Sequence, residues 1–173
     1  MPVVAVNAAL RAEHGVLAAA VAEPFSGQVF WADRGLARVR AEGMDTPLSP
    51  TAESKLVDLN LDPPFPNAPR FRAVSLLAQE AFTARFRPRV VSTTLALAWV
   101  AAGRRAAYVT DGHLVDSVHF AAGIALCQAA GCTVTAIDGQ PLHAGTGGLI
   151  AAADRQTHAV LLGMITNPTA PRG

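Results

Sequence analysis

Short runs of apolar residues, broken by turn residues, fill the first quarter of the chain and predict β-strands. The first run consists mostly of β-branched and small apolar residues, which is typical of a strand covered on both faces. Turns are expected at 14–15 and 24–27, where glycine, proline and serine gather. Strands joined in sequence by tight turns predict an antiparallel meander. The expected strands are residues 3–10, 16–23 and 28–32, with a short further strand around Val39.

The next segment is less regular. Residues 45–51 contain two prolines and are expected to form a loop, whereas 55–61 alternate apolar and polar residues like a half-buried strand. Residues 62–69 contain four prolines, which fix φ and remove donors, so this stretch is expected to be irregular. Apolar residues at helical spacing predict one amphipathic helix over 71–86, closed by Pro88.

Strands and helices alternate in the second half of the chain, which predicts helices packed on a sheet. Ser92 stands at an expected helix N-cap, and Gly103 and Gly131 stand where helices should end. Asp154 is expected to cap the last helix. The expected strands are 89–91, 106–110, 132–137 and 149–152; the expected helices are 95–102, 118–130 and 155–164; and 166–173 is expected to be a tail.

Composition narrows the class of protein. The 173 residues, 51% of them hydrophobic, suit one α/β domain with a buried core. The 14 basic and 13 acidic side chains give a formal charge of +1 and form no basic block, so neither nucleic acid nor an anionic membrane is indicated as a partner. No apolar run approaches the ~18 residues of a membrane span, and the start of the chain has no signal-peptide pattern.

Cysteine and histidine usage points to no separate site. Cys127 and Cys132 are five residues apart in an apolar stretch, too far round a helix to face each other. We therefore interpret them as buried thiols in a reducing compartment, and predict a cytoplasmic protein. The remaining histidines lack metal-ligand spacing and are expected at the surface: His14, His113, His143 and His158.

Several segments, in the same order along the chain, resemble motifs of the inositol monophosphatase family. Residues 92–104, STTLALAWVAAGR, resemble the family segment G-S-A-A-x-x-L-A-Y-V-A-A-G-R, and 118–131, VHFAAGIALCQAAG, resemble W-D-x-A-A-G-x-x-L-x-x-E-A-G-G. Residues 134–139 resemble V-T-D-x-x-G, and 148–154 resemble the late strand before the last helix. The front of the chain resembles F-P-F-x-A-V-S and the two strands after it, at 2–7, 20–24 and 30–35.

This resemblance implies a layered αβαβα fold and Mg²⁺-dependent hydrolysis of small phosphomonoesters. The implied substrates are inositol phosphates, sugar phosphates or histidinol phosphate, and a small phosphorylated metabolite is the expected partner. Such chemistry needs carboxylates to hold Mg²⁺, which activates water and neutralises phosphoryl oxygens. Family members often dimerise, so a homo-oligomer is also expected.

The family's metal ligands are mostly missing from this sequence. The family holds its ions with a glutamate and a D-P-x-D-G-T motif, both of which would precede Met1. We therefore expect one partial, N-terminally truncated domain over 1–173, divided into 1–45, 46–87, 88–165 and the tail 166–173, and assign no catalytic residue. The aspartate of W-D aligns with His119, a poor ligand for Mg²⁺ but acceptable to Zn²⁺ or Mn²⁺. Asp116 is the alternative metal ligand. If neither residue binds a metal, Asp116 is a solvated loop carboxylate and His119 is a hydrogen-bonded histidine at the start of a helix.

The implied substrate side of the site is better preserved. Ser92, Thr93 and Thr94 align with the motif that places hydroxyls and helix N-terminal amides near a phosphate, although Ser92 equally fits a plain helix cap. Val91 stands where the family usually has glycine, and its β-branched side chain is expected to narrow the approach of a phosphate to these residues. Asp111 lies near the family's substrate-contacting acidic position. Two hypotheses follow: a phosphatase fragment inactive by itself, or a non-catalytic relative that binds a phosphorylated ligand or a protein partner.

Overall fold

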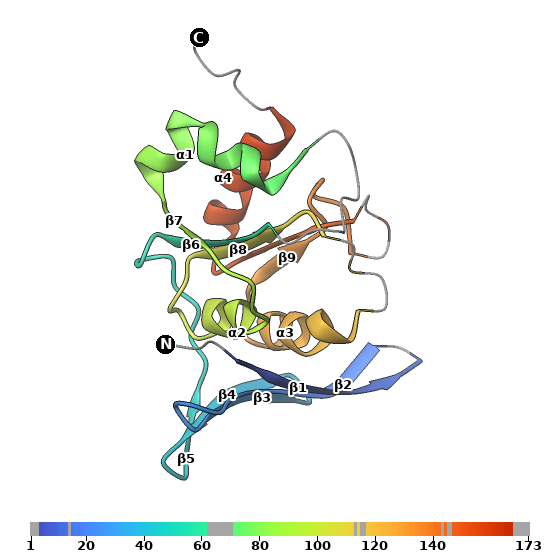
Figure 1. The fold of residues 1–173 in the computed structure, drawn as a ribbon. Coiled ribbons are helices and arrows are strands. Elements are labelled where there is room, and N and C mark those ends of the chain that lie inside the picture. The colour runs from blue at the N-terminus through green and yellow to red at the C-terminus, as the bar shows by residue number, and fades with distance from the viewer. Residues whose placement is uncertain are drawn as a thin grey trace.

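Helices and sheets alternate in layers through the protein (Figure 1). The computed structural model describes residues 4–13, 15–61, 71–112, 114, 117–142, 144 and 147–167. One sheet carries helices on both faces, and the inner helical layer separates it from a second sheet (Figure 1). The predicted α/β layered fold is thus confirmed as helix, sheet, helix, sheet. A fifth, outer helical layer is not found among the described residues.

The first sheet is the predicted antiparallel meander, with strands in the order β1-β2-β3-β4-β5. The expectation of a loop over 45–51 is wrong in part, because a fifth strand falls there. A two-residue turn at Glu42 and Gly43, with φ of 51° and 80°, returns the chain so that Met44 pairs with Ala41. Its strands are β1 (Val6–Ala12), β2 (Gly15–Glu23), β3 (Gln28–Asp33), β4 (Leu36–Ala41) and β5 (Met44–Pro47).

The second sheet is mixed, with strands in the order β7-β6-β8-β10-β9. Strand β6 runs parallel to β7 and β8, whereas β10 is antiparallel to β8 and β9. The prediction that β6 is half-buried is wrong: Val57, Asp58 and Leu59 are all buried, because helices cover both faces of this sheet. The strands are β6 (Leu56–Asn60), β7 (Arg87–Val90), β8 (Ala107–Thr110), β9 (Thr133–Thr135) and β10 (Leu149–Ala152).

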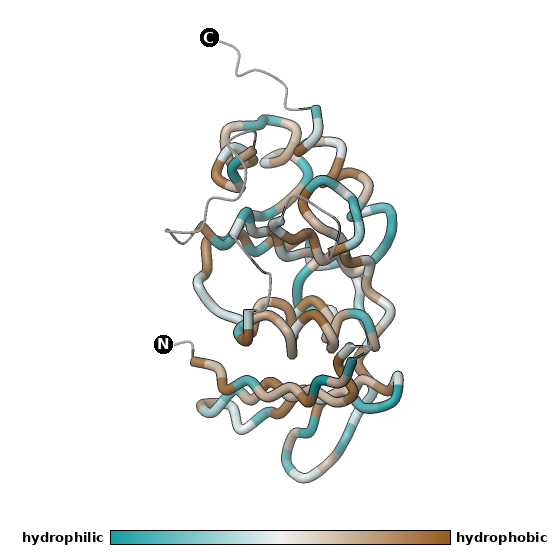
Figure 2. Tube along the Cα trace, turned by 90° about the vertical axis from the view of Figure 1, so that its right-hand side faces the viewer, coloured by the Kyte–Doolittle hydropathy of each residue, from teal (hydrophilic) through white to brown (hydrophobic). Residues whose placement is uncertain are grey.

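The inner layer contains α2 (Leu95–Ala101) and α3 (Val118–Ala129), which lie between the two sheets and are largely hydrophobic (Figure 2). Both predicted stops are confirmed, since Gly103 and Gly131 follow these helices with φ of 70° and 88°. The two helices approach closely at Gly123. A Cβ atom at this glycine would lie 2.7 Å from Cβ of Leu97, so the separation of α2 and α3 depends on the missing side chain.

The outer layer differs from the sequence prediction. The single helix expected over 71–86 is a 3₁₀ helix, Ala73–Ala78, followed by the short helix α1 (Glu80–Arg85). The break falls at Gln79, which is extended (φ −89°, ψ 117°) and buried, with Nε2 donating to the backbone oxygen of Met164 at 3.1 Å. Pro88 does not close a helix but lies in the edge strand β7, where its missing donor is tolerated.

The last helix, α4 (Arg155–Thr166), begins as predicted. The carboxylate of Asp154 accepts a hydrogen bond from the backbone nitrogen of Thr157 at 2.7 Å. The helix extends two residues beyond the predicted end. No helix in the described part of the chain has the length and apolar character needed to cross a bilayer.

Both thiols are free; Cys127 is buried as predicted but Cys132 is only half-buried, and the prediction that the two residues lie apart is wrong. Cys132 follows the end of α3, and its backbone nitrogen donates to the oxygen of Cys127 at 2.9 Å, which brings the two residues together. Contact with the Cys132 thiol and burial raise the pKa of Cys127. The Cys127 thiol also donates to the backbone oxygen of Leu97, so it contributes to the contact between α2 and α3.

His158 is buried against the second sheet rather than lying at the surface as predicted, with Nε2 2.8 Å from Oγ1 of Thr135. The other three histidines of that prediction lie outside the described residues. Burial lowers the pKa of His158 below its usual value of 6.5, because the imidazolium would lose its hydration.

We expect this histidine to make the protein less stable in mild acid. As the pH falls through the unfolded-state value near 6.5, the unfolded chain binds a proton that the folded chain resists, so the free energy of unfolding decreases. In His158→Gln, the decrease in the free energy of unfolding between about pH 7 and about pH 5 should be smaller. Urea unfolding at several pH values measures this. An unchanged pH profile would contradict the assignment.

Candidate functional site

The predicted site residues that the structure describes lie at one edge of the second sheet, where several strands end. The parallel strands β6, β7 and β8 all end at this edge, and β9 ends there too, because it pairs antiparallel to β10. Ser92–Thr94 follow β7, Asp111 follows β8, and His119 lies in the first turn of α3. In α/β sheets, ligands bind beyond the carboxyl ends of the strands, which makes this edge the candidate site.

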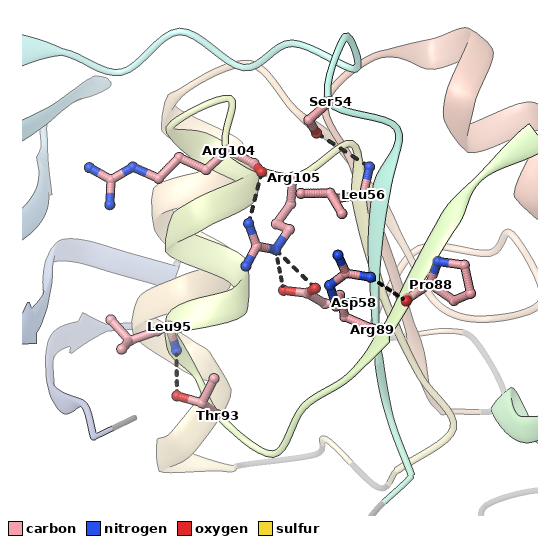
Figure 3. Close-up of polar contacts among 9 residues, drawn as sticks. All are labelled: Ser54, Leu56, Asp58, Pro88, Arg89, Thr93, Leu95, Arg104 and Arg105. Carbon is pink, nitrogen blue, oxygen red and sulfur yellow. Dashed lines mark hydrogen bonds and ion pairs between the residues drawn. The ribbon is translucent and has the colours of Figure 1, made fainter. Parts of the chain in front are cut away.

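The start of α2 is organised by threonines rather than by Ser92. The N-cap position is Thr94, so the predicted cap at Ser92 is wrong; Ser92 is two residues before it and exposed. Oγ1 of Thr93 accepts a hydrogen bond from the backbone nitrogen of Leu95 at 3.2 Å (Figure 3). The Thr93 side chain is therefore held at the start of the helix, and its hydroxyl oxygen already accepts one hydrogen bond from the backbone.

Thr94 connects the candidate site to the first sheet. Nδ2 of Asn7 in β1 donates to Oγ1 of Thr94 at 2.8 Å, and this hydroxyl lies 3.2 Å from Oδ1 of Asn7, to which it donates. The two residues are 87 positions apart. Sequence reasoning did not select Asn7, although it aligns near the end of the F-P-F-x-A-V-S segment.

Asp111 is buried at the end of β8 and forms an ion pair with Arg72, whose Nε donates to Oδ2. Sequence reasoning also missed Arg72, which precedes the 3₁₀ helix in the outer layer and is 39 residues away. A guanidinium carries five N–H donors, so Arg72 has donors beyond the one that contacts Asp111. Its side chain is 44% exposed, and a positive group therefore faces solvent at this edge.

Val91, which replaces the family's glycine, is part of the sheet rather than of the ligand approach. Its backbone nitrogen donates to the oxygen of Leu59 at 3.0 Å and extends the β6–β7 ladder. This amide is therefore committed to the backbone of β6 and is not directed at a ligand.

The predicted metal ligand that the structure describes, His119, belongs to no recognisable metal centre among the described residues. His119 is exposed, and Asp116 lies outside the described residues. Within the described ranges, no group of three or more His, Cys, Asp or Glu side chains is placed to hold a metal ion. Mg²⁺ prefers several oxygen ligands in octahedral geometry, whereas Asp111 is ion-paired with Arg72 and His119 offers nitrogen. These residues do not fit a Mg²⁺ site.

Similar structures include an inositol-monophosphate-bound staphylococcal enzyme, SaIMPase-II, which is 17% identical over 95% of this chain and 63% of that chain, with a TM-score of 0.68. SuhB of Mycobacterium tuberculosis is 24% identical over 92% of this chain and 63% of that chain (TM-score 0.71). The extragenic suppressor protein SuhB of Bartonella henselae is 22% identical over 95% and 63% (TM-score 0.75). The chain thus spans less than two thirds of the length of these solved relatives.

At these identities the solved structures establish the fold alone, and no curated protein sequence matches the chain. A family model is more informative, because it matches the chain over 1–168, almost its whole length, and is described as the inositol monophosphatase family. The layered fold, the order of the sequence motifs and this match agree. The chain belongs to the inositol monophosphatase family.

Proposed function

We propose that this chain binds a small phosphorylated ligand at the carboxyl edge of the second sheet, as the substrate side of an inositol-monophosphatase-like phosphomonoesterase. We also propose that it does not hydrolyse the ligand by itself. An inositol phosphate is the first candidate ligand, because the staphylococcal relative is described as bound to inositol monophosphate. Sugar phosphates and histidinol phosphate are the further candidates.

The Arg72–Asp111 ion pair carries this proposal. A carboxylate that is neutralised by a guanidinium no longer repels a phosphate, and the remaining Arg72 donors suit phosphate oxygens. Ser92 and Thr93 add hydroxyl groups from the neighbouring loop, and Thr94, whose hydroxyl donates to Asn7, positions the end of this loop. These groups favour binding an anion, whereas the described residues supply too few carboxylates for the metal-assisted step.

Two measurements on the purified chain test the proposal. Isothermal titration with inositol 1-phosphate should show binding, which Arg72→Gln should weaken about tenfold by removing a charge-assisted contact. Arg155→Gln, which removes an exposed arginine from the start of α4, is the matched control and should bind normally. Phosphate release from the same compound, with Mg²⁺ present, should not exceed the buffer rate.

Phosphate release that EDTA abolishes would contradict the proposal that the chain does not hydrolyse its ligand, and would make it a catalytic member of the family. Equal binding by wild type and Arg72→Gln would contradict the first half.

A non-catalytic family relative is the second candidate, and the His119 and Val91 positions favour it. Activity of the protein isolated from its native source distinguishes the two candidates. EDTA-sensitive phosphate release from that material would assign a phosphatase, and its absence, together with retained ligand binding, would assign a binding protein.

A further inference from the structure

A second, basic pocket lies between the end of α1 and the start of β7. It has a volume of about 400 Å³ and is called the α1–β7 pocket below. Seven described residues line it: Lys55, Thr83, Ala84, Arg85, Phe86, Arg87 and Pro88.

Three of these residues are cations, and no acidic side chain is among them. Lys55, Arg85 and Arg87 are exposed and form no ion pair with any residue that the structure describes. The guanidinium of Arg85 lies over the ring of Phe86, with its carbon 5.7 Å from the ring centroid. Positive charge is thus concentrated in a concave surface, and none of its described lining residues supplies a counter-charge.

The backbone fixes two of the cations beside each other. Lys55 has a left-handed conformation (φ 53°), which is unfavourable for a residue with a side chain. Its nitrogen donates to the oxygen of Ala52 at 3.0 Å, and its oxygen accepts from the nitrogen of Arg87 at 2.8 Å. This last bond joins the residue before β6 to the first residue of β7, so the backbones of the two charged residues are in direct contact.

The α1–β7 pocket is separate from the candidate site. Lys55 precedes β6 and Arg87 begins β7, and these parallel strands run from the pocket toward the carboxyl edge, where Ser92 and Asp111 lie. The pocket therefore lies at the amino-terminal ends of these strands, and the candidate site lies at their carboxyl ends.

We propose that the α1–β7 pocket binds a small polyanion that carries two or more phosphate groups. Arginine side chains match phosphate oxygens in a fork of two donors, and lysine adds a point charge. Three cations with no acidic neighbour in the lining favour an anion with more charge than a single phosphate monoester. A volume of about 400 Å³ admits a small ligand of this class.

Isothermal titration with tripolyphosphate, and separately with orthophosphate, tests the proposal on the whole chain. Wild type should bind tripolyphosphate more tightly than orthophosphate, and added salt should weaken both. The double variant Lys55→Gln/Arg87→Gln should bind tripolyphosphate at least about tenfold more weakly, because two charge-assisted contacts are removed.

The matched control is Arg34→Gln/Arg155→Gln, which also removes two positive charges from exposed positions, in the β3–β4 turn and at the start of α4. It should bind like wild type, and urea unfolding should show both double variants to be folded.

Equal weakening in the two double variants would overturn the proposal in favour of a general charge effect, as would the absence of binding by wild type. Loss of tripolyphosphate binding in Arg72→Gln alone would show that the anion binds at the candidate site and not in the α1–β7 pocket. Tighter binding of single-stranded nucleic acid than of tripolyphosphate would exclude a small ligand. Each of these results is independent of whether inositol 1-phosphate binds at the carboxyl edge.

Discussion

Replacing Asp58 with alanine is expected to lower the free energy of unfolding by about 3 kcal/mol, because the change leaves a largely buried arginine without its anion. Asp58 lies in the middle of β6 and is fully buried. Both of its carboxylate oxygens lie 2.9 Å from Nε of Arg105, which donates to them (Figure 3). The Arg105 guanidinium also lies over the ring of Trp99, 4.6 Å from its centroid, so it cannot easily turn to water.

Burial raises the pKa of Asp58, and the nearby Arg105 and Arg89 only partly oppose this. The free-energy cost of burying the Asp58 carboxylate therefore exceeds the favourable interactions of this group with Arg105 and Arg89. The Asp58–Arg105 pair as a whole contributes little to the free energy of unfolding. The double variant Asp58→Leu/Arg105→Met should consequently recover most of the stability lost in Asp58→Ala. Urea unfolding of the variants measures both effects. A double variant less stable than Asp58→Ala would show that the ion pair itself stabilises the fold.

Replacing Gly123 with alanine is expected to lower the free energy of unfolding by about 2 kcal/mol, because α2 and α3 would have to separate. The added Cβ would lie 2.7 Å from both Cβ and Cδ1 of Leu97. The Cδ1 atom can move by a rotamer change, but the Cβ atom moves only with the backbone of α2. Since α2 and α3 form the layer between the two sheets, the displacement would extend to both.

Gly163 is the matched control, because it also lies inside a helix and a Cβ atom there would meet nothing within 4 Å. Gly163→Ala should raise the free energy of unfolding by about 0.5–1 kcal/mol through helix propensity alone. Adding Leu97→Gly to Gly123→Ala should cost less than the sum of the two single changes, because only glycine at position 97 also removes the Cβ atom that the new side chain would meet. Additive losses, or a stabilising Gly123→Ala, would contradict the close contact. Thermal or urea unfolding of the variants decides this.

The elements that sequence reasoning placed correctly depend on local chemistry. The meander follows from short apolar runs and turn residues, and Asp154, Gly103 and Gly131 mark helix ends through backbone rules that act within a few residues. The failures have distant causes. The apolar spacing of 71–86 is helical, but the helix breaks at Gln79, and the side chain of this residue donates to the backbone of Met164 in α4, 85 positions away.

The candidate site divides in the same way. The family resemblance selected Ser92, Thr93, Thr94 and Asp111, and the structure places them at one edge of a sheet, with their role in ligand binding still a prediction. It did not select the residues that contact them. Asn7 reaches Thr94 from another sheet and Arg72 reaches Asp111 from another layer, and such pairs leave no periodic signal in a single sequence.

The order of strands in the two sheets has a consequence for the newly made chain. Strands β1 to β5 pair only with their neighbours in sequence, so the loops that must close are short. Strand β6 must wait for β8, which pairs Val57 with Ala107, and such non-local parallel pairing is slow. During synthesis the meander can therefore form before α2 and α3 exist to cover it. Val21 and Phe30 are fully buried in the folded protein, and we expect them to be exposed to water until these helices have formed. During that time, contact with another chain can compete with the packing of α2 and α3 on the first sheet.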